Sequence, residues 1–151
     1  MPRLKLTLPA DPDFQCALAV RVTDLNYGAH LGNQALLGLL HEARMQFLQV
    51  LGFDELGTDE RPGLIQSDAL IAFRSEAFLG DLLTIQLTAA DFERTNFDLY
   101  YEVRTNDRLI AQAKTNLAFF DYRMRKTAAI PETFLAALAL QRVKNEKVRE
   151  Q

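Results

Sequence analysis

The feature that most constrains the fold of this chain is a strongly apolar helical pattern over residues 33–51. Apolar residues recur at spacings of three and four for about five helical turns, and Gly52 follows as a helix terminator. The apolar positions are Leu36, Leu37, Leu39, Leu40, Ala43, Phe47, Leu48, Val50 and Leu51. Because this face is broader than the stripe of a surface helix, we expect other elements to enclose the helix.

Extended segments account for most of the remaining chain. From Phe14 to Val22, apolar residues alternate with other residues in the period of two that is typical of a half-buried strand. Further extended segments are expected at residues 64–78, 82–92, 97–105 and 109–120. A short helix beginning near Pro131 and a charged tail, residues 144–151, are expected to close the chain. The pattern predicts an α+β fold, an antiparallel sheet around one long central helix.

Composition narrows the function classes. A length of 151 residues fits a single domain covering residues 1–151. The chain is 48% hydrophobic and 25% charged with a formal net charge of -3, so we expect neither nucleic-acid nor membrane binding. Cys16 is the only cysteine, and no Cys/His cluster has zinc-ligand spacing, which favours a cytoplasmic protein without a bound metal. Neither a signal peptide nor a membrane-spanning run is expected.

A polar segment, DLNYGAHLGNQ at residues 24–34, lies directly ahead of the apolar helix. Backbone amides in the first turn of a helix lack intrahelical partners and lie at the positive end of the helix dipole, so they can hold an oxyanion. Gly28 and Gly32 are expected to allow tight turning and close approach of a ligand, and Asn33 is a good N-cap. The alternative is that the polar residues are ordinary turn formers and caps, with His30 a hydrogen-bonded structural residue.

Four motifs together suggest a family. They are VRVTDLNYGAHLGN, LLHEARMQFL on the helix, FLGDLLTI at a strand entrance, and FDYR followed by IP near the last strand. The chain therefore resembles the hotdog-fold thioesterases of the 4-hydroxybenzoyl-CoA thioesterase and acyl-CoA thioesterase superfamily. The resemblance implies a five- to six-stranded antiparallel sheet around the central helix and a homodimer, possibly assembled further into a homotetramer. It implies hydrolysis of an acyl-CoA or acyl-carrier thioester to acid and thiol, without a cofactor.

The resemblance also assigns residues, with one departure from the family pattern. The position of the family's catalytic aspartate is Asn26 here, and an amide cannot accept a proton as a carboxylate can, although it can orient water or bind a carbonyl. Candidates for the missing base are Asp24, two residues earlier, and His30, which aligns with the histidine of the motif. Glu42 lies nine residues beyond Asn33, on the opposite side of the helix, and is expected to serve the partner's site or to pair with a neighbouring charge.

The expected substrate-binding residues follow the same segment. Backbone amides near the helix entrance would hold the tetrahedral oxyanion, and the residues assigned to substrate binding are Tyr27, Gly28, Leu31, Gly32 and Asn33. Asn26 in place of aspartate keeps open a non-catalytic acyl-thioester-binding protein. A hotdog hydratase or dehydratase is a further alternative, but it needs an Asp/His pair placed over the acyl Cα and Cβ atoms.

Overall fold

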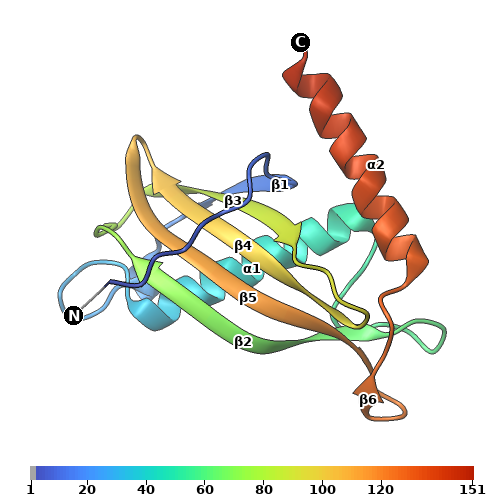
Figure 1. The fold of residues 1–151 in the computed structure, drawn as a ribbon. Helices are drawn as coiled ribbons and strands as arrows, with labels where there is room; N and C mark the ends of the chain where they lie inside the picture. The colour runs from blue at the N-terminus through green and yellow to red at the C-terminus, as the bar shows by residue number, and fades with distance from the viewer. Residues whose placement is uncertain (1–2) are drawn as a thin grey trace.

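A computed structural model describes residues 3–151 and places them in an antiparallel sheet and two α-helices (Figure 1). The helices are α1 (Asn33–Leu51) and α2 (Glu132–Arg149), and a 3-10 turn, η1, covers Val22–Asp24. The strands are β1 (Phe14–Ala19), β2 (Gly63–Phe73), β3 (Leu82–Ala90), β4 (Asn96–Thr105), β5 (Arg108–Asp121) and β6 (Lys126–Thr127). The α+β class expected from the sequence is confirmed.

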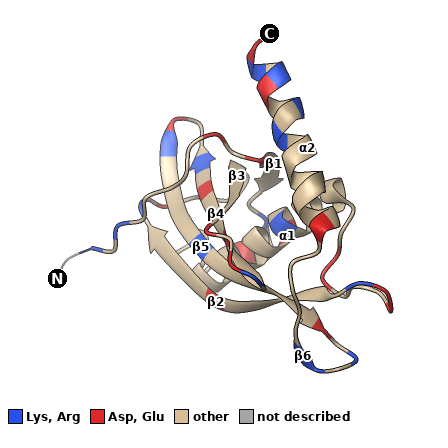
Figure 2. Cartoon of the chain, turned by 45° about the vertical axis from the view of Figure 1, so that its right-hand side comes forward, with Lys and Arg blue, Asp and Glu red and all other residues tan. Residues whose placement is uncertain are grey.

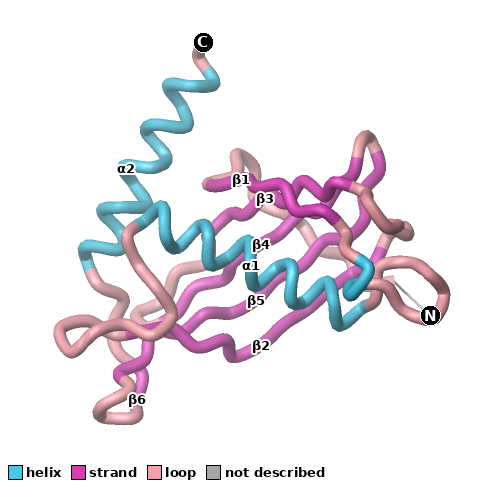
Figure 3. Tube along the Cα trace, turned by 180° about the vertical axis from the view of Figure 1, so that it is seen from behind, coloured by secondary structure: helices cyan, strands magenta, loops and turns pink. Residues whose placement is uncertain are grey.

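The sheet curves around α1. Its strand order is β1-β3-β4-β5-β2, all neighbours are antiparallel, and the short β6 pairs with the end of β5. Seen from behind, α1 runs across the concave face of the sheet, which supplies the other side of the core (Figure 3). Strands β1 and β2 form the two edges of this sheet.

Helix α1 follows the sequence prediction except at its cap. It spans Asn33–Leu51 and ends at Gly52, whose left-handed φ of 80° lets its amide reach carbonyls of the last turn. The expectation that Asn33 caps the helix is wrong. Gly32 is the N-cap, with extended backbone angles and no side-chain cap, so Asn33 already belongs to the first turn. Within residues 3–151, no helix combines the length and apolar character that a membrane span needs.

The C-terminal segment differs from the sequence expectation. In place of a short helix and a charged tail, one helix, α2, runs over Glu132–Arg149, with its charges gathered toward the C-terminus (Figure 2). Phe134 and Leu138 are buried against the core, which anchors the first half of α2. The guanidinium of Arg142 binds the buried carboxylate of Asp13 at 2.7 Å, which anchors the second half. The helix is longer than expected because these tertiary contacts stabilise residues that show no clear helical periodicity in the sequence.

The extended segment expected at residues 64–78 is shorter than predicted, because β2 ends at Phe73. The following residues form a loop that is fixed to its surroundings. The amides of Arg74 and Ser75 donate to the carbonyl of Ile110 on β5, and the carbonyl of Ala77 accepts the amide of Leu31 at 2.8 Å. The β2–β3 loop is thereby held directly against the polar segment that precedes α1.

Candidate active site

The polar segment before α1 forms a compact loop. The amide of Asn26 donates to the carbonyl of His30 at 2.9 Å, and the amide of Ala29 donates to the carbonyl of Asn26 at 3.1 Å. The left-handed residue of this turn is Ala29, with φ of 60°, whereas Gly28 and Gly32, which were expected to allow the tight turn, do not have a positive φ. Gly28 leaves room for a side chain: a Cβ atom there would lie 2.9 Å from Nε2 of His30, so the imidazole would have to move. The close approach permitted by Gly28 is therefore that of the imidazole ring.

Asn26 shapes the loop and orients His30. Its Oδ1 accepts the amide of Gly28 at 2.9 Å and that of His30 at 3.4 Å, as in an Asx turn. Its Nδ2 lies 3.4 Å from Nδ1 of His30, and the same Nδ1 lies 3.3 Å from the carbonyl oxygen of Leu31. The other ring nitrogen, Nε2, is directed toward Glu76, 3.8 Å from Oε1. Asn26 therefore fixes one side of the imidazole and leaves Nε2 available.

The carboxylate of Asp24 stabilises the turn in which it lies. This carboxylate is buried and accepts the backbone amide of Arg21 at 2.9 Å and the Arg21 guanidinium at 3.1 Å. Side-chain hydrogen bonding from Arg21 holds the pKa of Asp24 below its usual range. A carboxylate stabilised in its charged form accepts protons poorly, so these contacts favour a structural role for Asp24.

The free backbone donors lie later in the chain than the sequence indicated. The amide of Leu31 donates to Ala77, and the amide of Gly32 donates to the carbonyl of Asp24 at 2.9 Å, so neither amide can hold an oxyanion. Among the described residues, no acceptor is found for the first-turn amides of α1, which belong to Asn33, Gln34 and Ala35. These donors lie at the positive end of the helix dipole.

Two cavities adjoin this helix entrance, and Asn33 lines both. The smaller, of about 240 Å³, is mostly apolar; it is lined by His30, Leu31, Asn33, Phe73, Arg74, Ser75, Glu76, Ala77 and Ile110. The larger, of about 580 Å³, is more polar; it is lined by Arg21, Thr23, Asp24, Leu25, Asn26, Gly32, Asn33, Gln34, Ala35 and Gly38. Tyr27 is fully exposed and lines neither cavity. A group bound at the amide of Asn33 would thus adjoin both cavities, whereas Gln34 and Ala35 line only the larger one.

Glu42 lies outside both cavities. It is exposed and accepts a hydrogen bond from Gln46 at 3.0 Å. Its charge helps to raise the pKa of Arg21, after the larger effect of Asp24, and the pKa of Cys16, after the larger effect of burial. Glu42 therefore faces the side of α1 that carries β1 and η1.

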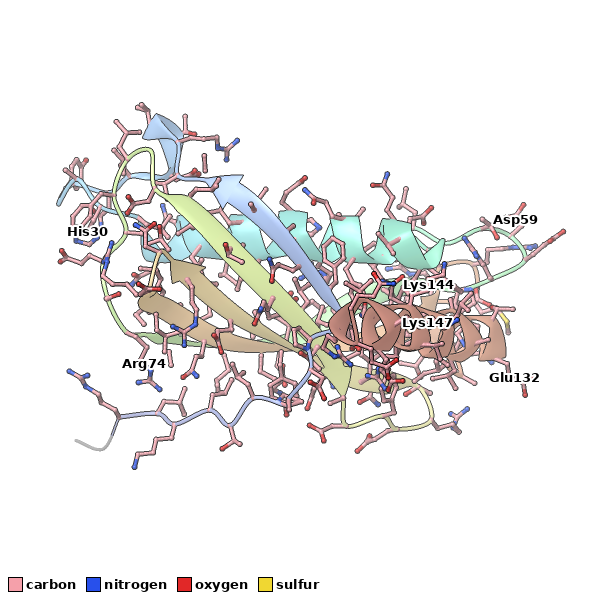
Figure 4. All side chains as sticks on the ribbon, turned by 90° about the horizontal axis from the view of Figure 1, so that it is seen from above. His30, Asp59, Arg74, Glu132, Lys144 and Lys147 are labelled. Atoms are coloured by element: carbon pink, nitrogen blue, oxygen red, sulfur yellow. The ribbon has the colours of Figure 1, made fainter. Side chains whose placement is uncertain are left out.

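The sequence reasoning missed the residues that the β2–β3 loop contributes. Glu76 and Arg74 line the smaller cavity beside His30, and Figure 4 shows His30 and Arg74 at the same end of the molecule. A signal was present, since Glu76 lies directly ahead of the FLGDLLTI motif. By itself the motif indicates only a strand entrance, because the proximity of this loop to His30 depends on the tertiary contact between Leu31 and Ala77.

A further cavity, of about 390 Å³, lies between α2, the end of β3 and residues 9–13. Arg142, which lines this cavity, is bound to Asp13, so this ion pair connects α2 to the segment before β1. Within residues 3–151, no group of His, Cys, Asp and Glu side chains is arranged to hold a metal ion.

Comparison with known proteins identifies the family. Residues 20–138 match the model of the thioesterase-like superfamily. A 1,4-dihydroxy-2-naphthoyl-CoA hydrolase from Crocosphaera subtropica is 30% identical over 103 residues, which cover 64% of this chain and 74% of that protein.

Solved structures agree with this match at the level of the fold. The 1,4-dihydroxy-2-naphthoyl-CoA thioesterase from Synechocystis superposes with a TM-score of 0.74 at 23% identity, covering 83% of this chain and 95% of that one. A gentisyl-coenzyme A thioesterase superposes with a TM-score of 0.73 at 20% identity, covering 83% and 99%. The chain belongs to the thioesterase-like superfamily and has the hotdog fold, as the sequence motifs predicted.

The contacts of Asp24 generate a prediction about stability and pH. Asp24→Asn should lower the free energy of unfolding at neutral pH by about 1.5 to 3 kcal/mol, the usual range for a hydrogen bond to a charged group. Because the pKa of Asp24 is depressed in the folded state, this contribution is complete above the ordinary value of 3.8 and disappears as the pH falls through the folded value. Urea unfolding of both proteins from pH 7 to pH 2 measures it. Asp59→Asn, in an exposed loop, is the control; equal losses in both variants would contradict the assignment.

The glycines provide a second prediction. Gly28→Ala should lower kcat/KM at least tenfold, because the added Cβ displaces the His30 ring, whereas Gly32→Ala meets only ordinary contacts at 3.5 Å or more. Thermal melting should show both variants folded. Steady-state kinetics with an acyl-CoA that the wild type hydrolyses makes the comparison. Equal activities for the two variants would mean that the position of the imidazole is unimportant.

Proposed function

We propose that this protein hydrolyses an acyl-CoA thioester to a free acid and coenzyme A at the N-terminus of α1. The observation that carries the proposal is the set of free amides at Asn33, Gln34 and Ala35, of which Asn33 lines both cavities, in a member of the thioesterase-like superfamily. A thioester carbonyl at these amides leaves one cavity for the acyl group and the other for the pantetheine arm.

The proposed reaction develops negative charge on the carbonyl oxygen of the thioester. When the oxygen of a water attacks the carbonyl carbon, the carbonyl oxygen becomes an oxyanion, and fixed amide donors at a helix N-terminus stabilise it without reorganisation. Collapse of the tetrahedral intermediate breaks the carbon–sulfur bond, and the thiolate of coenzyme A leaves and takes up a proton. His30 lies beside this position with Nε2 free, and Asn26 keeps the imidazole oriented.

The small cavity supports a compact acyl group as the substrate class. Most of its lining surface is apolar, and His30, Asn33, Arg74, Ser75 and Glu76 supply polar groups, a combination that is usual in ligand pockets. The relatives that are named for a substrate act on 1,4-dihydroxy-2-naphthoyl-CoA and gentisyl-coenzyme A, both hydroxylated aromatic thioesters. Hydroxyaryl-CoA thioesters are therefore the first substrates to test, with straight-chain acyl-CoAs as the comparison.

We also propose that the working form is a cytoplasmic homodimer. Edge strand β2 spans Gly63–Phe73 and pairs with β5 on one side, while its other side has no partner strand within residues 3–151. An unpaired edge of this length invites pairing with a second copy, which would continue the sheet. Light scattering at micromolar concentration should give twice the mass of one chain. A fully active monomer would contradict this proposal.

Turnover of an acyl-CoA panel, followed by release of free thiol, tests the function. Asn26→Ala should lower turnover because it releases the loop and His30, whereas Asn26→Asp should be tolerated, since a carboxylate oxygen accepts the same amides. His30→Ala should cost about 10² to 10⁴ in rate if the imidazole takes part in proton transfer. Circular dichroism checks that each variant is folded.

The same panel separates the alternatives. A wild-type protein that binds acyl-CoA and releases no thiol would be an acyl-thioester-binding protein. This alternative follows from the presence of Asn26 in place of the catalytic aspartate. Addition of water to an enoyl-CoA without thiol release would identify a hydratase. Wild-type turnover in both Asn26→Ala and His30→Ala would place the reaction elsewhere in the molecule.

A further inference from the structure

We propose that Glu76 is the general base of the hydrolysis and replaces in space the carboxylate that Asn26 lacks. The inference rests on the thioesterase function proposed above and names the group that removes the proton from the attacking water. Glu76 belongs to the β2–β3 loop and is distant in sequence from the motif that contains Asn26 and His30.

The backbone on either side of Glu76 is fixed. The hydroxyl of Ser75 donates to the carbonyl of Leu109 at 2.7 Å, and the buried Ala77 accepts the amide of Leu31 through its carbonyl. The backbone carbonyl of Glu76 accepts a hydrogen bond from the guanidinium of Arg108. These contacts hold the loop on β5 and on the helix entrance together, so Glu76 extends from a braced segment.

The carboxylate of Glu76 faces His30 across the smaller cavity. Its Oε1 lies 3.8 Å from Nε2 of His30, and 61% of the Glu76 side chain is exposed. Among the described residues, no other side chain forms a hydrogen bond or ion pair with this carboxylate. Asp24, in contrast, is neutralised by Arg21. Glu76 is therefore a carboxylate whose one side-chain neighbour of this kind, within the described residues, is His30.

This separation suits a shared water molecule. A water within about 2.8 Å of both Oε1 of Glu76 and Nε2 of His30 fits a separation of 3.8 Å between them. When Nδ1 of His30 accepts a hydrogen bond from Nδ2 of Asn26, the ring proton is on Nε2, which donates to the water, and the water donates one hydrogen to Glu76. The remaining lone pair of the water is then free to attack a carbonyl carbon held near Asn33, which lines the same cavity.

The proton balance is complete without a further reagent. As the water oxygen bonds to the carbonyl carbon, one water proton passes to the Glu76 carboxylate, and the carbonyl oxygen becomes the oxyanion. When the carbon–sulfur bond breaks, the same proton passes from Glu76 to the departing thiolate. The carboxylate is thereby regenerated, and the products are the acid and coenzyme A.

Kinetics of Glu76 variants test the inference. Glu76→Gln keeps the size of the side chain and removes its basicity, so kcat should fall by about 10² to 10⁴ with little change in KM. Glu76→Asp should retain intermediate activity. Glu93→Gln, a glutamate in the β3–β4 loop, is the matched control and should have wild-type turnover. Binding of a non-hydrolysable thioether analogue, measured by calorimetry, should be equal in wild type and Glu76→Gln.

A second-site rescue separates a base from a structural residue. In the double variant Asn26→Asp with Glu76→Gln, the new carboxylate occupies the family's position and should recover at least tenfold of the lost kcat. A Glu76→Gln variant with wild-type kcat, or one that has lost analogue binding, would overturn the role of Glu76, and so would the absence of rescue. These outcomes leave thioesterase activity in the wild type; a wild type that releases no thiol would overturn the proposed function as well.

Discussion

The enclosure of α1 by the curved sheet is the constraint on which the rest of the molecule depends. The apolar face of α1 packs against strands that are distant from it in sequence, and its buried residues include Leu36, Leu40, Phe47 and Leu48. Burial on this scale supplies the main stabilising free energy of a domain of this size. It also fixes the position and direction of the helix axis, so the amides at the N-terminus are held at a defined point beside β2 and the β2–β3 loop.

Arg44 adds a polar requirement to this apolar interface. Its guanidinium is buried within the helix–sheet layer and donates to Glu55 at 2.7 Å, to Gln66 at 3.1 Å and to the hydroxyl of Tyr101 at 3.3 Å. A buried charge without partners is very costly, so these contacts determine the rotation of α1 relative to β2 and β4. The side chains of α1 therefore have one arrangement that satisfies both the apolar face and Arg44.

At the N-terminus of α1, the fold leaves backbone amide donors free to bind a ligand. The loop before α1 satisfies its own polar groups: the amide of Leu31 bonds to Ala77, that of Gly32 bonds to Asp24, and Asn26 accepts two loop amides. The amides of the first turn remain because no residue in the described chain reaches them. A helix without a side-chain N-cap is less stable than a capped one. This loss of stability is consistent with a site in which the substrate accepts hydrogen bonds from the free amides.

The sequence alone determined the central helix, the class of the fold and the family, because apolar periodicity, the terminating Gly52 and the motifs are local signals. It did not determine the full length of α2, which depends on contacts of Phe134 and Arg142 with distant parts of the chain. Nor did it show which amides are free or that Glu76 faces His30. Those features arise where separate segments meet, and the distance between two segments is set by the packing of the whole sheet around α1, which no local pattern encodes.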